Sequence, residues 1–191
     1  MKMKRILTLT WQHALIGLLC VSLVACTVDE VLSSIDVALQ TAASLSTAIG
    51  AVSPADGAAI TLLTGLGIKG LQAIQAAYDQ YEKNKTSSTL QNVVDAATAI
   101  QTNLPQELAA LKISSPEAVT KATAWVNLMV ACAQGVVTVV TAAAGSRRAT
   151  AASYTLTGEY IQSQWQSTVC GGDAACGALV KVHHKHAHWK L

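Results

Sequence analysis

Phenylalanine is missing from this 191-residue chain, and aromatic residues together make up only 4% of it, although 51% of the residues are hydrophobic. Alanine, threonine, valine and leucine must therefore fill the interior. Small side chains let helices approach closely, but each one buries little area, so stability has to come from many modest contacts. This composition favours a close-packed helical bundle.

Sequence motifs of common catalytic sites are missing as well. The chain has no Gly-x-Ser-x-Gly elbow, no His-Glu-x-x-His pair and no calcium-binding loop. Every histidine after residue 26 lies within the last ten residues, so a serine or cysteine elsewhere has no base near it in sequence. We therefore expect a protein that is not an enzyme and that carries no catalytic residues and no bound cofactor.

The N-terminus has the pattern of an export signal. Three basic residues fall within the first five positions, and residues 6–28 then carry no formal charge. The most apolar stretch, residues 14–24, is about half of the roughly 20 residues that a membrane-spanning helix needs. Cleavage of residues 1–25 is therefore favoured over permanent anchoring as a helix.

The apolar stretch ends in Leu23-Val24-Ala25-Cys26. This tetrapeptide resembles the lipobox of bacterial lipoprotein precursors, in which an aliphatic residue, a tolerant position and a small residue precede a cysteine. The resemblance implies that Cys26 receives a diacylglyceryl group, that the signal is cut before it and that the new amino group is open to acylation. Two or three acyl chains hold a protein durably on a membrane.

The surroundings of Cys26 refine this interpretation. Cys20 does not match the lipobox, because Leu19 is too large for the position before the cut. Resemblance to lipoproteins of two-membrane bacteria implies that Thr27, since it is not Asp, directs the chain to the outer membrane. In a host with one membrane, the outer face of the cytoplasmic membrane is the expected address. A conventionally cleaved signal followed by a chance cysteine is the alternative.

Basic residues do not gather in the remainder of the chain. Without residues 1–25, ten basic side chains stand against eleven acidic ones, a net charge of −1, and only Arg147 and Arg148 are adjacent bases. Proteins that bind nucleic acid carry clustered basic residues that displace counterions from phosphates. We therefore expect no nucleic-acid partner. The expected partner is the membrane, through the acyl chains on Cys26, and the sequence names no protein partner.

Helix start signals and apolar residues at alternating spacings of three and four predict an all-α fold, a helical bundle of four to five antiparallel helices. A capping box at Thr27 and Glu30 begins a first helix over residues 28–49. Ser53, followed by proline, begins a second helix that ends near Lys83. The expected core positions of these two helices are Val28, Leu32, Ile35, Leu39, Ala42, Ser46 and Ile49, and Ile60, Leu63, Gly67, Leu71, Ile74, Tyr78 and Tyr81.

The later helices follow the same rules. A capping box at Ser88 and Gln91 begins a third helix, which Pro105 is expected to interrupt before a short helical turn over residues 106–111. Ser115, again followed by proline, begins a fourth helix. The expected core positions of the third helix and of a fifth are Leu90, Val93, Ala97, Ile100 and Leu104, and Tyr154, Ile161, Trp165 and Val169.

These elements divide the chain into a signal at residues 1–25, an Ala-rich helical bundle at 26–169 and an irregular tail at 170–191. The tail carries Cys170 and Cys176, separated by five mostly small residues. Export places cysteines where disulfides persist, so we expect these two to pair and to pin the C-terminal segment. A metal or redox pair is the alternative, although the Cys-x-x-Cys spacing of such sites is missing.

Four histidines, at positions 183, 184, 186 and 188, lie close together at the C-terminal end of the chain. Imidazoles at these offsets can chelate Zn or Ni adventitiously. No second cluster of histidines or carboxylates elsewhere in the sequence would complete a dedicated site. The interpretation that we favour is a solvated basic terminus, and weak metal handling by His183, His184, His186 and His188 is the alternative.

Two further features invite a functional interpretation. Residues 65–70 match the letters of a dinucleotide-binding fingerprint, but no strand-helix series surrounds them, so we expect close helix contact instead. Cys132 lies in the uncharged fourth helix and is expected to be a buried, apolar thiol.

The sequence therefore predicts a membrane-anchored lipoprotein with a non-catalytic structural or interaction role. A different hypothesis comes from the fourth helix, because residues 122–146 carry no formal charge and are long enough to span a bilayer. On that hypothesis the protein is membrane-active and inserts its second and fourth helices.

Overall fold

The computed structural model describes residues 31–50, 53–144 and 157–181. These residues form helices and turns and contain no strand, which confirms the expected all-α class for this part of the chain. The predicted signal, the capping box at Thr27 and Glu30, and the histidine-rich terminus lie outside the described residues.

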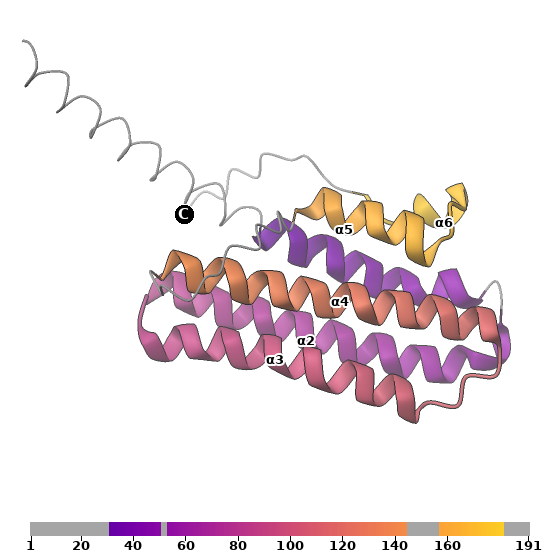
Figure 1. Ribbon diagram of the computed structural model, residues 1–191, viewed down its shortest axis with the longest axis horizontal. Coiled ribbons are helices and arrows are strands. Elements are labelled where there is room, and N and C mark those ends of the chain that lie inside the picture. The colour runs from indigo at the N-terminus through magenta and orange to yellow at the C-terminus, as the bar shows by residue number, and fades with distance from the viewer. Residues whose placement is uncertain (1–30, 51–52, 145–156, 182–191) are drawn as a thin grey trace, which may run out of the picture.

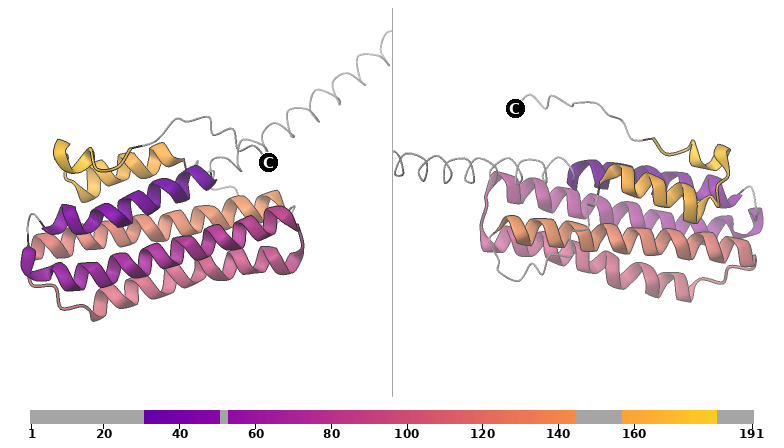
Figure 2. Two further views of the ribbon diagram at one scale, coloured as in Figure 1. Left: turned by 180° about the vertical axis from the view of Figure 1, so that it is seen from behind. Right: turned by 45° about the horizontal axis from the view of Figure 1, so that its top comes forward.

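Four long helices lie side by side, and a shorter C-terminal layer covers one of them (Figure 1). The chain passes from α2 to α3 at one end of these helices and from α3 to α4 at the other (Figure 1). Figure 2 shows the same layering from behind and from above. The elements are a first helix at residues 31–50, η1 (Pro54–Asp56), α2 (Gly57–Lys83), α3 (Ser87–Ala110), α4 (Pro116–Ala143), α5 (Gly158–Gln164), the π-helical turn η2 (Trp165–Val169) and α6 (Ala174–Gly177).

The apolar spacing of α2 predicts its buried face correctly. All seven expected core positions of this helix, from Ile60 to Tyr81, are buried. The intervening positions include Lys69, Gln72 and Gln75, which are exposed. An apolar stripe at spacings of three and four faces one side of a helix, so α2 is anchored along its whole length against the other helices.

The first helix buries a broader surface than its apolar stripe predicts. Ile35, Ala42 and Ile49 are buried as expected, but Ser46 is exposed, which corrects that assignment. Thr41 and Val37 are buried although the stripe omits them. The cause is that this helix is covered from two sides, by α4 and by α5.

Pro105 does not interrupt the third helix, contrary to the sequence-based expectation. α3 continues through Pro105 to Ala110 as one element. A proline inside a helix removes one hydrogen bond and costs about 3 kcal/mol. Pro105 is exposed, however, while Leu104 is buried and Leu108 packs against the core. Packing on both sides of the proline therefore keeps the helix continuous.

The start of α3 lies slightly earlier than predicted. Its N-cap is Thr86, whose hydroxyl accepts a hydrogen bond from the backbone N–H of Thr89, while the Thr89 hydroxyl accepts one from the Thr86 N–H. The capping box is therefore formed by two threonines instead of Ser88 and Gln91. At α4 the expectation is confirmed, since Ser115 caps the helix and Pro116 is its first residue.

Trp125 of α4 lies at the centre of the interior and is fully buried. Its indole N–H donates a hydrogen bond to the Thr41 hydroxyl of the first helix over 3.2 Å. Its ring lies against Gly67 of α2, where an added Cβ atom would approach Trp125 Cζ2 to 2.9 Å. One side chain therefore joins the first helix, α2 and α4.

The C-terminal layer is helical over much of its length. Ile161, Trp165 and Val169 are buried, which confirms the core expected there, and Tyr154 lies outside the described residues. Residues 170–181 are less irregular than predicted, because they contain the short helix α6. α5 approaches the first helix closely at Gly158, where a Cβ atom would come within 2.7 Å of the Ser33 hydroxyl and 2.9 Å of Val37 Cγ2.

Two glycines of α2 provide a matched test of this packing. We expect Gly67→Ala to lower the free energy of unfolding by about 1–3 kcal/mol, because the new methyl group overlaps the fixed Trp125 ring. Gly65 has open space where its Cβ would lie, so Gly65→Ala should instead raise the free energy of unfolding by about 0.5–1 kcal/mol. Urea unfolding of both variants measures the difference, and equal effects would contradict the arrangement.

Candidate functional site

The predicted cysteine pair forms a disulfide. Cys170 and Cys176 are bonded, with their Cα atoms 5.5 Å apart, and both are buried. Gly171 and Gly172 adopt positive φ angles of 60° and 84° in the intervening turn, a conformation that glycine adopts without strain. Asp173 then caps α6 by accepting a hydrogen bond from the Ala175 N–H over 2.8 Å. The expected structural pairing is confirmed.

The disulfide ring fixes a short segment against the first helix. Trp165 donates its indole N–H to the carbonyl oxygen of Cys176, and Gln162 donates to that of Val180 over 2.9 Å. Residues of the same segment also form hydrogen bonds with Ser44 and Gln40 of the first helix. We call residues 178–181 the C-terminal strap. It couples the end of the described chain to the first helix.

Cys132 is buried, as predicted from its place in an uncharged helix. Burial away from water raises the pKa of its thiol to about 12, and a hydrogen bond with the Ser34 side chain opposes this only in part. The described residues contain no histidine that could act as a base. The Cys132 thiol is therefore protonated at neutral pH and is unsuited to nucleophilic catalysis.

Asp56 forms a polar cluster that sequence reasoning missed. The sequence suggests only an acidic residue in the first turn of the second helix, yet the Asp56 side chain is 4% exposed. One carboxylate oxygen accepts hydrogen bonds from the backbone N–H and the hydroxyl of Ser114, each over 2.8 Å. The other accepts from the Ser115 N–H at 3.2 Å and from the Ser53 hydroxyl at 2.6 Å.

This cluster ties the start of α2 to the start of α4. The hydrogen bond from the Ser114 backbone, followed by the one from the Ser53 hydroxyl, lowers the pKa of Asp56 from 3.8 to about 2. Every donor comes from the protein, so the carboxylate is already satisfied. Asp56 therefore joins the starts of two helices and has a structural role. We call this carboxylate and its four hydrogen bonds the Asp56 latch.

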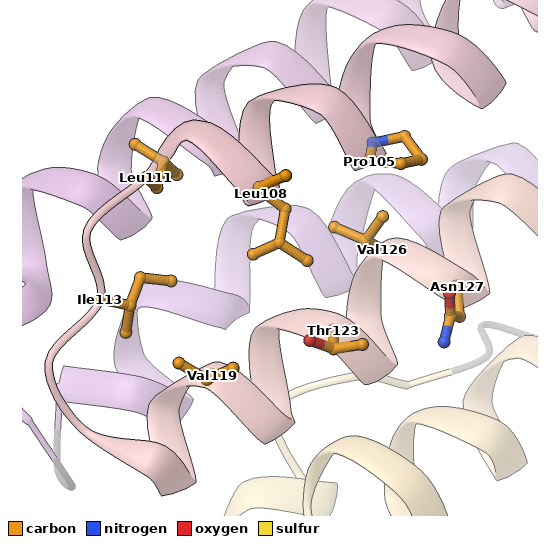
Figure 3. Close-up of a pocket in the computed structure, with 9 residues that line it drawn as sticks. Pro105, Leu108, Leu111, Ile113, Val119, Thr123, Val126 and Asn127 are labelled. Atoms are coloured by element: carbon orange, nitrogen blue, oxygen red, sulfur yellow. The ribbon is translucent and has the colours of Figure 1, made fainter.

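An apolar groove lies between the end of α3 and the start of α4 (Figure 3). Leu108 and Leu111 line it from α3 and its C-cap, Ile113 from the connecting loop, and Val119 and Val126 from α4. Its volume is about 400 Å³. Pro105 closes one side, and Figure 3 shows Leu108 and Val126 facing each other across the space.

The groove can shelter apolar groups but cannot transfer protons. Thr123 and Asn127 are its polar side chains, and no ionisable side chain lines it. Acid–base chemistry needs a titratable group within hydrogen-bond reach of the reacting atoms. The groove therefore fits a binding role for an apolar surface better than a catalytic one.

The remaining predicted sites are either placed differently or lie outside the described residues. Residues 65–70 lie in the middle of α2, and Gly67 and Gly70 contact Trp125 and Ile100, which confirms the close-packing interpretation over a nucleotide site. Within the described residues no group of three or more His, Cys, Asp or Glu side chains could hold a metal ion. Cys26 and the histidines at 183–188 lie outside the described residues.

Comparison with known proteins gives no family for this chain. No family model, no curated protein and no solved structure matches it.

The Asp56 latch makes stability depend on pH. Because folding lowers the pKa of this carboxyl from 3.8 to about 2, its stabilising effect is complete above pH 4 and is lost as the pH falls towards 2. We expect Asp56→Asn to reduce stability at neutral pH and to flatten the fall in stability between pH 4 and 2. Thermal unfolding across this range measures both effects.

Asp79→Asn is the matched control, because Asp79 is exposed on α2. This variant should keep the wild-type pH profile. A profile for Asp56→Asn that falls as steeply as that of the wild type would contradict the latch.

Proposed function

We propose that this chain is a bacterial lipoprotein with a non-catalytic structural or interaction role in the cell envelope. On this proposal residues 1–25 are removed and acyl chains on Cys26 hold the protein on a membrane. That membrane is the outer membrane of a two-membrane host, and otherwise the cytoplasmic membrane at its outer face. The observation that carries the proposal is the sequence Leu23-Val24-Ala25-Cys26 at the end of a charge-free apolar stretch.

One feature of the described structure supports the proposal. Helix is already present at residue 31, five residues after Cys26, so the folded part begins close to the proposed lipid anchor. We propose further that the long helices and the C-terminal layer form one bundle of four to five antiparallel helices. Such a bundle, held against the membrane with almost no linker, would suit a partner that is itself at the membrane surface.

A non-catalytic role is supported by the chemistry of the described residues. The groove lacks an ionisable lining, the Cys132 thiol is buried, and the Asp56 carboxylate is satisfied by four hydrogen bonds from the protein. These are properties of structural groups, since a catalytic group needs access to a substrate.

A membrane-active protein is the second candidate function. Within the described residues, two helical stretches are long and apolar enough to cross a bilayer, namely Pro54–Lys83 and Pro116–Ala142. The apolar faces of both stretches lie inside the protein. Ile60 and Leu63 of α2 and Trp125 of α4 are fully buried there. Insertion would have to break this interior apart, so we favour the lipid-anchored bundle.

Metabolic labelling with palmitate tests the proposed anchor. We expect the full chain, expressed in a bacterial host, to incorporate the label and to lose the mass of residues 1–25. Cys26→Ser should abolish the label and leave the signal uncleaved, because the acylated thiol and the cleavage site are both removed. Immunoprecipitation followed by mass spectrometry measures label and cleavage together.

Cys20→Ser is the matched control, since it removes a cysteine from the same apolar stretch without changing the lipobox. It should be labelled and cleaved like the wild type. Label that survives in Cys26→Ser, or a wild-type chain without label, would contradict the proposal.

A further inference from the structure

The C-terminal strap has few contacts with the elements on which it lies. Of its side chains, that of Val180 is buried and the others are exposed. Its backbone forms hydrogen bonds with the side chains of Ser44 and Gln40 of the first helix, over 3.4 and 3.2 Å, and of Gln162 of α5, over 2.9 Å. Segments with few buried contacts open at a low cost in free energy. The strap therefore needs a further constraint to stay in place.

The disulfide ring supplies this constraint immediately before the strap. Cys170 is the C-cap of η2, and Cys176 lies in α6, two residues before the strap begins. The indole N–H of Trp165, whose side chain is fully buried, donates a hydrogen bond to the carbonyl oxygen of Cys176 over 3.3 Å. On the chain-entropy model, closing a ring of this length disfavours open conformations by about 50-fold. The closed ring thus keeps α6 and the strap over Trp165.

The position of the ring makes it accessible through a small opening. The C-terminal layer lies on the outside of the long helices (Figures 1 and 2), and the residues between the two cysteines, 171–175, are all exposed. Cys176 is 8% exposed and Cys170 is 3% exposed. Cys132, in contrast, is fully buried in α4, where its thiol is hydrogen-bonded to Ser34 of the first helix. Exposure of Cys132 therefore requires the long helices to separate, whereas exposure of the disulfide does not.

We propose that the disulfide between Cys170 and Cys176 makes α6 and the C-terminal strap a redox-sensitive lid over Trp165. Reduction by an external dithiol frees the strap from the first helix and uncovers Trp165, while the first helix, α2, α3 and α4 stay packed together. Tryptophan is a common anchor residue in contacts between proteins, so the open lid presents a surface that the closed lid hides. The lid does not depend on the lipid anchor, because its residues take no part in anchoring.

The reduction exchanges one disulfide for another. A thiolate of the dithiol attacks Sγ of Cys176, the more exposed cysteine, the bond to Cys170 breaks, and Cys170 leaves as a thiolate that takes up a proton. The second thiol of the reductant loses its proton, attacks the mixed disulfide and releases Cys176, which is protonated in turn. Two electrons and two protons pass from the dithiol to the protein, and the reductant becomes a disulfide.

Alkylation of the cysteines tests whether the disulfide is reduced in the folded protein. The full chain is treated with dithiothreitol and then with iodoacetamide, with and without urea, and its peptides are analysed by mass spectrometry. We expect Cys170 and Cys176 to be alkylated without urea. Cys132 should stay unmodified until urea unfolds the protein, so it serves as an internal reference for global unfolding.

Hydrogen exchange then shows which part of the protein opens. After reduction, the backbone amides of residues 177–181 should exchange about 50-fold faster, while those of α2, α3 and α4 keep their rates. Cys170→Ser combined with Cys176→Ser should show the same pattern without reductant and should not respond to it. Cys132→Ser is the matched control, since it removes a buried cysteine outside the ring, and it should respond to reduction like the wild type.

Three results would overturn the lid. Alkylation of Cys170 and Cys176 only together with Cys132 would mean that the disulfide is reached by global unfolding. Unchanged exchange at residues 177–181 in the reduced protein would mean that the strap stays closed without the disulfide. Equally faster exchange in α2, α3 and α4 would mean that the disulfide supports the fold as a whole.

Discussion

The fold depends on the burial of the Trp125 ring between three helices. Large aromatic side chains are rare in this chain, so one indole supplies contacts that many small residues cannot. Its position requires a gap in α2, which Gly67 provides, and a hydrogen-bond acceptor on the first helix, which Thr41 provides. The Thr41 hydroxyl in turn donates to the Ala38 carbonyl, so both polar groups are satisfied inside the protein. A tryptophan without these two partners would leave either a clash or an unpaired N–H.

Apolar spacing predicts much of this architecture because it records which face of a helix meets the interior. The stripe of α2 is correct at every position, and Gly67 and Gly70 are correctly assigned to close packing, whereas Gly65 has open space beside it. The prediction fails where tertiary contacts act from a second direction. The apolar spacing predicts that Ser46 is buried, but it is exposed. The same spacing omits Thr41, which lies against Trp125 of α4, and Val37, which lies against Gly158 of α5. Pro105 is mispredicted for a related reason. The low helix propensity of proline predicts a break in α3, but packing on both sides of Pro105 keeps the helix continuous.

The polar sites also show that contacts between residues far apart in the sequence are hard to predict from it. The pairing of Cys170 with Cys176 follows from spacing and export, because both partners are close in sequence. The partners of Asp56, namely Ser114 and Ser115, lie 58 and 59 positions further along the chain. Nothing in the local sequence around Asp56 reveals them. The repeated Ser-Pro start of the second and fourth helices was the available signal, since two similar helix starts at the same end of a bundle can share one carboxylate. The apolar groove likewise combines two helices and a loop, so it could be found only from the structure.

On the proposed function, α2 and α4 form the interior of a protein that acyl chains on Cys26 hold at a membrane. The most direct measurement uses a chain in which a conventional, cleavable export signal replaces residues 1–26, followed by carbonate washing of the membranes and circular dichroism of the released protein. We predict a soluble, helical protein, because Trp125 and the buried faces of both helices need no lipid. Retention of this chain in carbonate-washed membranes would contradict the account, since the two helices themselves would then be inserted.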